Sequence, residues 1–329
     1  MGRKQWVHAQ NGYRNKFPEV IAALNKKLGK DSTIEQGLHN LDESTEYNSN
    51  KILRFEVEGI AFNMIRVDGG TFTMGATPEQ INEAMDDEKP EHKVTLSSFY
   101  IGETQVTQAL WENVMKANPS YFKGDLRLPV ESVTWNDCQS FIKKLSQLTG
   151  RKFYLPTEAQ WEFAARGGKR SQGYKYAGSN NINRVAWCVD SRKNDLVEQK
   201  HAASNDWLLY DMLNSVTSRR FQLPGDKQLV GDMEISNSDI SGTCVVASKS
   251  PNELGLYDLS GNVWEWCQDV SGKYGGDEQN NPTGPSLGDY RVIRGGSWHS
   301  SAGACRVSFR NSFSPDDKSN ILGLRLVLY

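Results

Sequence analysis

Short segments with well-marked ends constrain the fold of this 329-residue chain more than any other feature. Three stretches begin with an N-cap threonine, at Thr77, Thr134 and Thr157. A threonine hydroxyl accepts a hydrogen bond from the free N–H groups of a first helical turn. The second and third stretches end at Gly150 and Gly167. The sequence therefore predicts three short amphipathic helices. We assign all three to packing, because a periodic apolar face is what a core helix needs.

The other patterned segments are short strands between Gly, Pro and Asn turns. Residues typical of strands occupy His92 to Glu103, Arg291 to Ser297, and Leu322 to Tyr329, where leucines alternate strictly. A further helix is predicted from Pro18 to Leu28. Because long elements are few, and the chain has 29 Gly and nine Trp, we expect an α+β domain with many ordered loops.

Composition excludes several classes of function. Charged residues make up 24% of the chain and the formal net charge is -2, a balance that does not favour nucleic acid as a partner. No run approaches the roughly 18 apolar residues of a membrane span. The start of the chain also lacks the apolar core of a signal peptide. The five cysteines form no CxxC pair, which argues against a zinc ribbon and leaves a single disulfide open.

Several ordered blocks give the chain a family resemblance. They include "GGTFTMG", "YLPTEAQWEFAARGG", "ELGLYDLSGNVWEW" and the C-terminal "RVIRGGSW". In this order they resemble the formylglycine-generating enzyme, or sulfatase-modifying factor, family over roughly Gly59 to Tyr329. The resemblance implies a C-type-lectin-like fold with a small twisted antiparallel sheet, two main helices and ordered loops. We expect this domain over 56–329, after an N-terminal extension over 1–55, with an insertion near 189–246 and a variable region near 298–322.

The resemblance also implies where copper would bind. In catalytic members of the family, two cysteines five residues apart hold copper and activate oxygen to oxidise a substrate cysteine. The second corresponds to Cys305 and the first to Ser300. A serine hydroxyl does not replace a thiolate for soft Cu(I), and one thiolate does not make a two-coordinate sulfur site. We therefore expect no copper and no formylglycine generation, and we interpret Cys305 as a core residue.

A second enzymatic branch of the superfamily holds a non-haem iron with histidines of an HxxxHxE-type motif. The N-terminal region here offers only His8 and His39, and the other histidines, His92, His201 and His299, are isolated. A lone histidine is more often a surface or core residue than a metal ligand. We assign no iron site.

The turn "YDLSGNVWEW" matches a structural calcium site of the family. The resemblance implies four ligands: the Asp258 side chain, the Gly261 and Val263 carbonyls, and the Glu265 side chain. A hard cation prefers carboxylate and carbonyl oxygens, and a Gly-Asn turn can direct successive carbonyls inward. The alternative is a tight turn that only places two tryptophans in the core.

A stretch without helical or strand period lies between Trp298 and Gly323. Its variable positions alternate with anchors such as Arg306 and Arg310. Every residue type among them can be reached from an AAC codon by replacing adenine, whereas Glu, Gln, Met and Trp cannot and are absent. This pattern resembles the variable proteins diversified by diversity-generating retroelements. We refer to these positions as the varied set: His299, Ser300, Ser301, Gly303, Ala304, Phe309, Asn311, Ser312, Phe313, Ser314, Asp316 and Asp317.

The composition of the varied set favours binding. Two exposed phenylalanines beside small polar residues would give rigid anchors with adaptable hydrogen-bonding neighbours, as in antibody loops. The alternative is an ordinary polar loop over two buried phenylalanines. On the binding hypothesis the set forms one exposed patch, and the interleaved apolar residues point inward: Trp298, Cys305, Val307, Leu322 and Leu324.

Two functions from different classes follow. The first is a retroelement-diversified ligand-binding protein whose target is a protein. The second is a divergent metal- or oxygen-dependent enzyme of the formylglycine-generating family. Under the first we expect a location at the cell surface or outside the cell, with the targeting or anchoring segment outside this sequence. A cytoplasmic location is the alternative.

Overall fold

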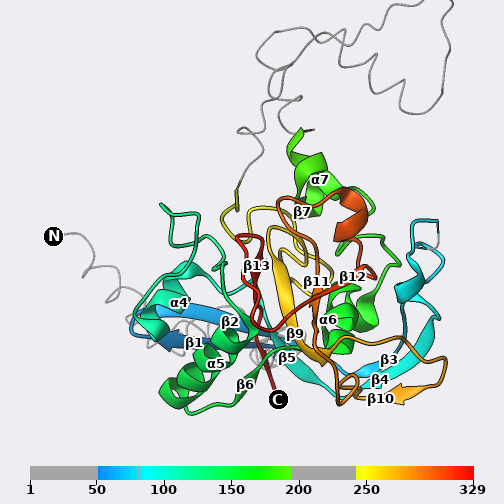
Figure 1. Cartoon of the computed structure of the whole chain (residues 1–329), viewed down its shortest axis with the longest axis horizontal. Coiled ribbons are helices and arrows are strands. Elements are labelled where there is room, and N and C mark those ends of the chain that lie inside the picture. The colour runs from blue at the N-terminus through cyan, green and yellow to red at the C-terminus, as the bar shows by residue number, and fades with distance from the viewer. Residues whose placement is uncertain (1–50, 81, 194–241) are drawn as a thin grey trace, which may run out of the picture. The chain divides into compact units, whose positions relative to one another are not determined.

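A computed structural model describes residues 51–80, 82–193 and 242–329. The predicted helix at Pro18 to Leu28 and nearly all of the expected insertion lie outside the described residues. The described residues from Ile52 onward belong to one unit, Ile52–Tyr329. Figure 1 shows short strands and helices joined by long loops.

A five-stranded antiparallel sheet joins the start of this unit to its end. The C-terminal strand lies between two strands from the first half of the chain, so the sheet closes the domain. In spatial order the strands are β1 (Ile52–Val57), β2 (Ile60–Val67), β5 (Phe99–Gly102), β14 (Val327–Leu328) and β6 (Phe153–Tyr154).

A four-stranded sheet carries the C-terminal region. Its two antiparallel pairs join β11 to β9 and to β12, and β13 runs parallel to β9. The strands are β12 (Arg310–Phe313), β11 (Arg291–Arg294), β9 (Trp264–Val270) and β13 (Leu322–Gly323). Smaller sheets join β10 (Gln279–Asn280), β4 (His92–Leu96) and β3 (Gly70–Met74), and join β7 (Ala186–Trp187) to β8 (Ser260–Gly261).

The strand predictions hold with three changes. The predicted strand from Arg291 to Ser297 ends at Arg294. The segment from His92 forms two strands, because the chain leaves β4 at Ser97 and enters β5 at Phe99. The final segment is also split, and residues 322–328 are buried throughout, although strict alternation predicts one exposed face. The C-terminus is therefore a central element of the core.

Two of the three predicted helices are confirmed. Thr134 and Thr157 accept hydrogen bonds from the backbone N–H groups of Asp137 and Gln160 as N-caps. The helices of the described residues are α4 (Gln108–Met115), α5 (Trp135–Thr149), α6 (Glu158–Ala165) and α7 (Ile182–Val185), with the 3-10 turns η1 (Asp86–Glu88), η2 (Gly168–Arg170) and η4 (Ala302–Cys305).

The predicted helix after Thr77 is wrong. Turns and the short η1 take its place. The Thr77 hydroxyl donates to Glu79 and accepts from Arg166, so it caps no helix. The Gln80 side-chain oxygen accepts from Arg306. Tertiary partners thus take both side chains of the apparent capping box.

Helix α6 is not amphipathic. All eight of its residues are buried, including the carboxylates Glu158 and Glu162. Buried carboxylates need charged or hydrogen-bonding partners. The charged partners of Glu158 are Arg294 and Arg310 of the C-terminal region, and those of Glu162 are Arg294 and the neighbouring Arg166, so this helix does more than pack.

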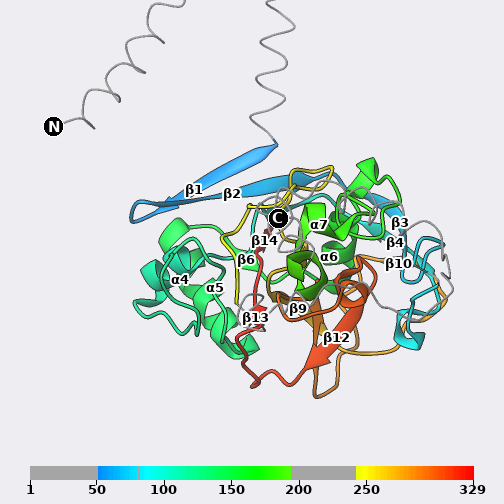
Figure 2. The same ribbon diagram turned by 90° about the horizontal axis from the view of Figure 1, so that it is seen from above.

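The C-terminal region lies along one side of the domain. In Figures 1 and 2, β12 lies on the same side of the domain as β9, from which β11 separates it, and the loop after β12 leads back to β13. The pairing of β12 with β11 and of β13 with β9 fixes both ends of that loop. The five cysteines form no disulfide with one another.

Candidate ligand-binding surface

The varied set lies at the surface. No member is buried: His299, Ser301, Asn311, Asp316 and Asp317 are exposed, and the other seven are half-buried. The interleaved side chains behave in the opposite way. Among the predicted inward residues, Cys305, Val307, Leu322 and Leu324 are each 0% exposed.

Trp298 departs from the prediction, because it is half-buried. Its backbone N–H donates to Asn262 and its indole Nε1 donates to the Asn320 carbonyl at 3.0 Å. The Trp264 N–H donates to the Ile321 carbonyl. The beginning and the end of the variable region are therefore tied to each other and to the start of β9.

Phe309 and Phe313 are half-buried and do not form the exposed anchors expected from the sequence. Both pack against the core cluster of α4, α5 and β13. The Phe309 ring centroid lies 6.0 Å from that of Trp264. Each phenylalanine supports the surface from below and leaves part of its ring accessible.

Arg306 anchors the middle of the varied set. Its guanidinium is 1% exposed and donates to both carboxylate oxygens of Glu88, at 2.6 and 2.8 Å. It also donates to the Gly303 carbonyl at 2.9 Å and to the Glu83 carbonyl at 3.0 Å. The Ser308 hydroxyl donates to the same Glu88 carboxylate. The residues on either side of Arg306 are thereby fixed to the η1 turn.

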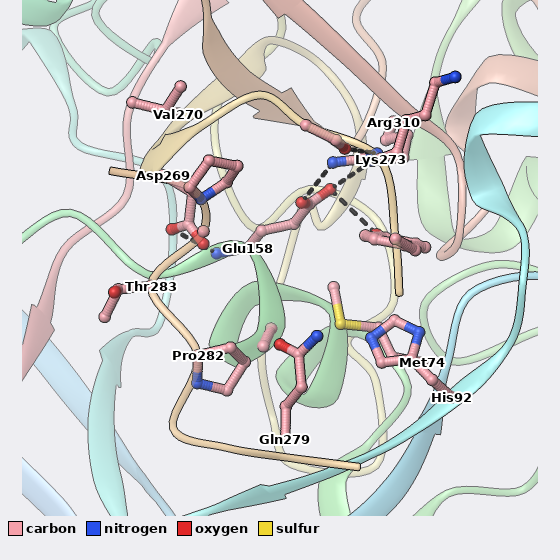
Figure 3. A pocket seen from close by; sticks show the side chains of 15 residues that line it. Met74, His92, Glu158, Asp269, Val270, Lys273, Gln279, Pro282, Thr283 and Arg310 are labelled. Carbon is pink, nitrogen blue, oxygen red and sulfur yellow. Dashed lines mark hydrogen bonds and ion pairs between the residues drawn. The ribbon is translucent and has the colours of Figure 1, made fainter. Parts of the chain in front are cut away.

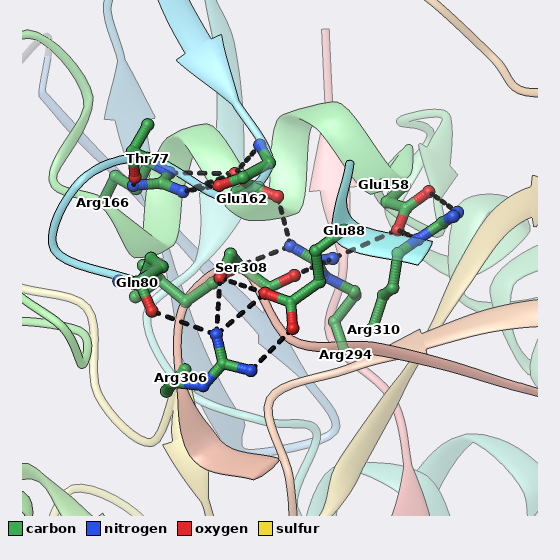
Figure 4. A network of polar contacts seen from close by, with 12 residues as sticks. Thr77, Gln80, Glu88, Glu158, Glu162, Arg166, Arg294, Arg306, Ser308 and Arg310 are labelled. Atoms are coloured by element: carbon green, nitrogen blue, oxygen red, sulfur yellow. Dashed lines mark hydrogen bonds and ion pairs between the residues drawn. The ribbon is translucent and has the colours of Figure 1, made fainter. Parts of the chain in front are cut away.

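Two further arginines connect the C-terminal region to α6. Arg310 donates to both Glu158 oxygens at 2.7 and 2.8 Å, and Arg294 bridges Glu158 and Glu162. Arg294 also donates to the carbonyls of Val307 and Ser308. Figure 4 shows that these contacts form one network with Arg306 and Glu88. The network holds the backbone between varied positions.

The network fixes the charge state of its acids. Burial by itself would raise the pKa of Glu88, but hydrogen bonds from Arg306, the Met85 N–H and Ser308 outweigh it and leave the pKa lowered. For Glu158 burial is likewise outweighed, here by the charges of Arg310 and Arg294. Both carboxylates are therefore ionised at neutral pH and attract the arginines fully.

An aromatic row that the sequence does not indicate borders the varied set. Tyr121 is 70% exposed and its ring meets Phe122 edge-on, at 5.1 Å between centroids. Phe122 meets Trp298 in the same way at 5.3 Å, and Trp298 contacts His299 at 5.1 Å. The sequence around Tyr121 does not indicate that this loop lies beside Trp298, because the two segments are about 180 residues apart along the chain.

The pair corresponding to the copper-binding cysteines does not fit copper. The Ser300 hydroxyl is hydrogen-bonded to Ser297, and Cys305 is fully buried. The side chain that lies against Cys305 is Cys188, a neighbour that no sequence pattern indicates. A hydrogen bond with the Cys305 thiol, helped by backbone N–H groups, lowers the pKa of Cys188 to about 6 despite its burial. The same contact raises the pKa of Cys305.

The residues implied for calcium do converge, but around a side chain. The carbonyls of Asp258, Gly261 and Val263 and the Glu265 carboxylate all accept from the amide Nε2 of Gln105. Asp258 contributes its backbone carbonyl to this set, and its side-chain Oδ2 accepts from the Ala247 N–H. The turn needs left-handed backbone at Asp258 and Gly261, with φ of 58° and 84°.

Two cavities in the described part of the chain are lined by residues other than the varied set, although Arg310, which stands between two varied positions, lines the first. One of about 330 Å³ contains Asp269, Glu158, Tyr274 and His92 under the loop after β9 (Figure 3). Burial and the charge of Glu158 raise the pKa of Asp269 to about 7. The other, of about 280 Å³, lies beside Gln105. No member of the varied set lines either one.

Comparison with known proteins places this geometry in a family. The model of the sulfatase-modifying factor enzyme 1-like domain matches residues 54–329. The chain belongs to this family. It is 31% identical over 304 residues to "Chaperone protein LppX" of Paenibacillus barcinonensis, covering 82% of this chain and 90% of that protein. It is 29% identical over 316 residues to the formylglycine-generating enzyme of Streptomyces coelicolor, covering 79% and 87%.

A solved structure extends the comparison to the fold. Treponema denticola variable protein 1 superposes with a TM-score of 0.63 at 28% identity, covering 84% of this chain and 98% of that one. The family and the C-type-lectin-like α+β fold expected from the sequence are thus confirmed. Within this sulfatase-modifying factor family, similarity extends both to a protein named as an enzyme and to one named as a variable protein.

Proposed function

We propose that this member of the sulfatase-modifying factor family is a ligand-binding protein whose varied set is diversified by a retroelement. One observation carries the proposal. None of the twelve varied residues is buried, whereas the apolar residues Cys305, Val307, Leu322 and Leu324 that alternate with or follow them are fully buried. Substitution at the exposed positions leaves the core intact, and the exposed side chains, such as those of Ser301 and Asn311, face solvent where a partner can reach them.

The glycines of the region support the same contrast between surface positions that can be substituted and buried positions that cannot. A Cβ on Gly303, a varied position, would come no closer than 3.8 Å to another residue. A Cβ on Gly296 would lie 2.6 Å from the Cys305 sulfur, and one on Gly323 would lie 2.4 Å from the Val130 carbonyl. Larger side chains therefore fit at the varied glycine and clash at the fixed ones.

We propose a protein as the partner. Small ligands are usually bound in concave, enclosed sites, and the varied set lines neither of the two cavities described above. Its half-buried phenylalanines with exposed Ser, Asn, Asp and His side chains suit a protein interface, where a few aromatic residues carry most of the energy. The match to a variable protein supports the proposal. A partner outside the cell would require surface display or export. No helix among the described residues is long and apolar enough to cross a membrane.

The genomic neighbourhood tests the proposal. We expect a reverse-transcriptase gene and a near-copy of the coding segment from about Trp298 onward, with adenines at the varied codons. A sulfatase gene in their place, with no such copy, would contradict it.

A second candidate function is a divergent enzyme, and the thiol pair Cys188 and Cys305 is the observation that favours it. Two adjacent thiols, one with a lowered pKa, are a sulfur donor set suited to a soft metal. Both are fully buried, which leaves no route for a substrate cysteine. Incubation with a sulfatase-motif peptide, copper and reductant tests this candidate. Loss of the peptide thiol by mass spectrometry, abolished by Cys188→Ser, would establish it, and an unchanged peptide would exclude formylglycine generation by this thiol pair.

A further inference from the structure

The amide group of Gln105 lies at the centre of a cage of oxygen atoms. Its Nε2 is 3.1 Å from the Asp258 carbonyl, 3.3 Å from that of Gly261 and 2.8 Å from that of Val263. The Oε1 atom of Glu265 is 3.1 Å away. Gln105 is 1% exposed. Four oxygens from one turn thus surround a single nitrogen in the interior.

The cage requires a donor at its centre. Four converging oxygens repel one another unless something positive lies between them, and an amide NH₂ supplies two N–H groups. The orientation of the amide follows, because the reverse would place the Gln105 oxygen against four others. The Gln105 Oε1 atom has no hydrogen-bond partner. The cage therefore takes up the amide nitrogen, and no protein donor bonds the amide oxygen.

With the Gln105 amide in place, the cage does not fit a divalent cation. Calcium is bound by oxygens at about 2.3–2.6 Å, whereas these oxygens stand 2.8–3.3 Å from the Gln105 Nε2 atom and are arranged around it. The charge of Glu265 is also already compensated. Arg325 donates to both of its carboxylate oxygens, and the Trp161 indole donates to Oε2 at 2.7 Å. A cation would have to displace Gln105 and lie close to the Arg325 guanidinium.

We propose that the Gln105 amide is the permanent occupant of this cage and replaces a bound cation. The turn 258–265 leads directly into β9, which pairs with β11 and β13 and carries Trp264 beneath Phe309. The strands below the varied set are thus held by a group of the chain itself. The fold needs no calcium, and the inference does not depend on the proposed binding function.

The wild-type protein provides the first test. After purification with calcium present and removal of free ions, the full chain should contain far less than one calcium per molecule by elemental mass spectrometry. Its Tm should be the same in calcium and in EDTA, because a ligand that does not bind cannot stabilise by mass action. Calcium near one per chain, or a Tm that falls in EDTA, would overturn the proposal.

A substitution at Gln105 provides the second test. Gln105→Glu replaces the donor by a carboxylate facing Glu265 and three carbonyls, so the Tm should fall in EDTA and rise again by about 5 °C or more in millimolar calcium. Gln108→Glu is the matched control. Gln108 is also fully buried and donates to the Phe122 and Pro129 carbonyls, but it faces no carboxylate. We expect its loss of Tm to be unaffected by calcium.

The proposal can be decided whether or not the Gln105→Glu variant folds. A Gln105→Glu protein that folds and does not respond to calcium would overturn it, as would equal rescue of the Gln108→Glu control. If Gln105→Glu does not fold, Gln105→Ala serves instead, because it opens the cage to the adjacent cavity of about 280 Å³. Calcium should raise its Tm, and the wild-type calcium content stands as an independent result.

Discussion

Replacement of Arg306 by alanine should detach the varied set from the scaffold. The substitution removes the two hydrogen bonds to Glu88 and those to the Gly303 and Glu83 carbonyls. Glu88, which is 0% exposed, would keep only Ser308 and the Met85 N–H as donors. A buried carboxylate would then be left without its counter-ion.

The expected loss is large. Breaking a buried ion pair by removing one partner costs about 3–5 kcal/mol, a substantial part of the roughly 5–15 kcal/mol that stabilises a folded domain. Arg66→Ala is the control, because its ion pair with Asp68 is 40% and 56% exposed at the two side chains. Exposed pairs contribute about 0–1 kcal/mol. Urea denaturation of both variants at neutral pH measures the difference.

The pH dependence identifies the cause. The pKa of Glu88 is lowered in the folded protein, so its stabilising contribution is present above its ordinary value of 4.5 and is lost as the pH falls. The cost of Arg306→Ala should therefore be greatest near neutral pH and shrink below about pH 4. A cost below about 1 kcal/mol, or one that is equal at both pH values, would refute the role given to this ion pair.

Three further predictions concern other parts of the molecule. Asp269→Asn should flatten the stability profile: its folded pKa of about 7 lies above the ordinary 3.8, so the wild type loses stability as the pH rises between these values, and parallel profiles in urea titrations would contradict this. Gly261→Ala should cost about 2 kcal/mol or more, because a Cβ would lie 2.4 Å from the Trp187 carbonyl; an unchanged Tm would count against the described turn. Ser301→Tyr and Asn311→Tyr should each change the free energy of unfolding by less than about 0.5 kcal/mol, and larger losses in urea titrations would show that these positions support the fold.

The N-cap threonine signal predicts two helices correctly and a third one wrongly. Thr134 and Thr157 cap helices because their hydroxyls find no better partner than the backbone of the next turn. Thr77 carries the same signal, but Arg166 takes its hydroxyl. That competitor is 89 residues away in sequence and becomes a neighbour only in the folded chain. Local patterns therefore predict an element only where tertiary contacts do not compete.

The positions of the varied set were more predictable from the sequence than the residues that hold them in place. Small polar residues interleaved with Cys305 and Val307 correctly indicate which positions are not buried, because burial of those types without partners is costly. The aromatic row from Tyr121, the Cys188 thiol and the Gln105 amide were not foreseen. Each reaches its place through loops that the sequence leaves without a pattern. The exposure of Phe309 and Phe313 was overestimated, since periodicity does not reveal that their rings rest on the core.

The most direct test of the proposed function is a display library of this chain in which the codons of the varied set are randomised together. Protease resistance should show that most clones remain folded, and selection against an unrelated soluble protein should yield binders that lose affinity when the original residues are restored. An equal number of randomised codons at buried positions such as Val307 and Leu324 should destroy folding. If most clones of the first library unfold, or if binders arise from changes outside the varied set, this surface is not a diversified binding site.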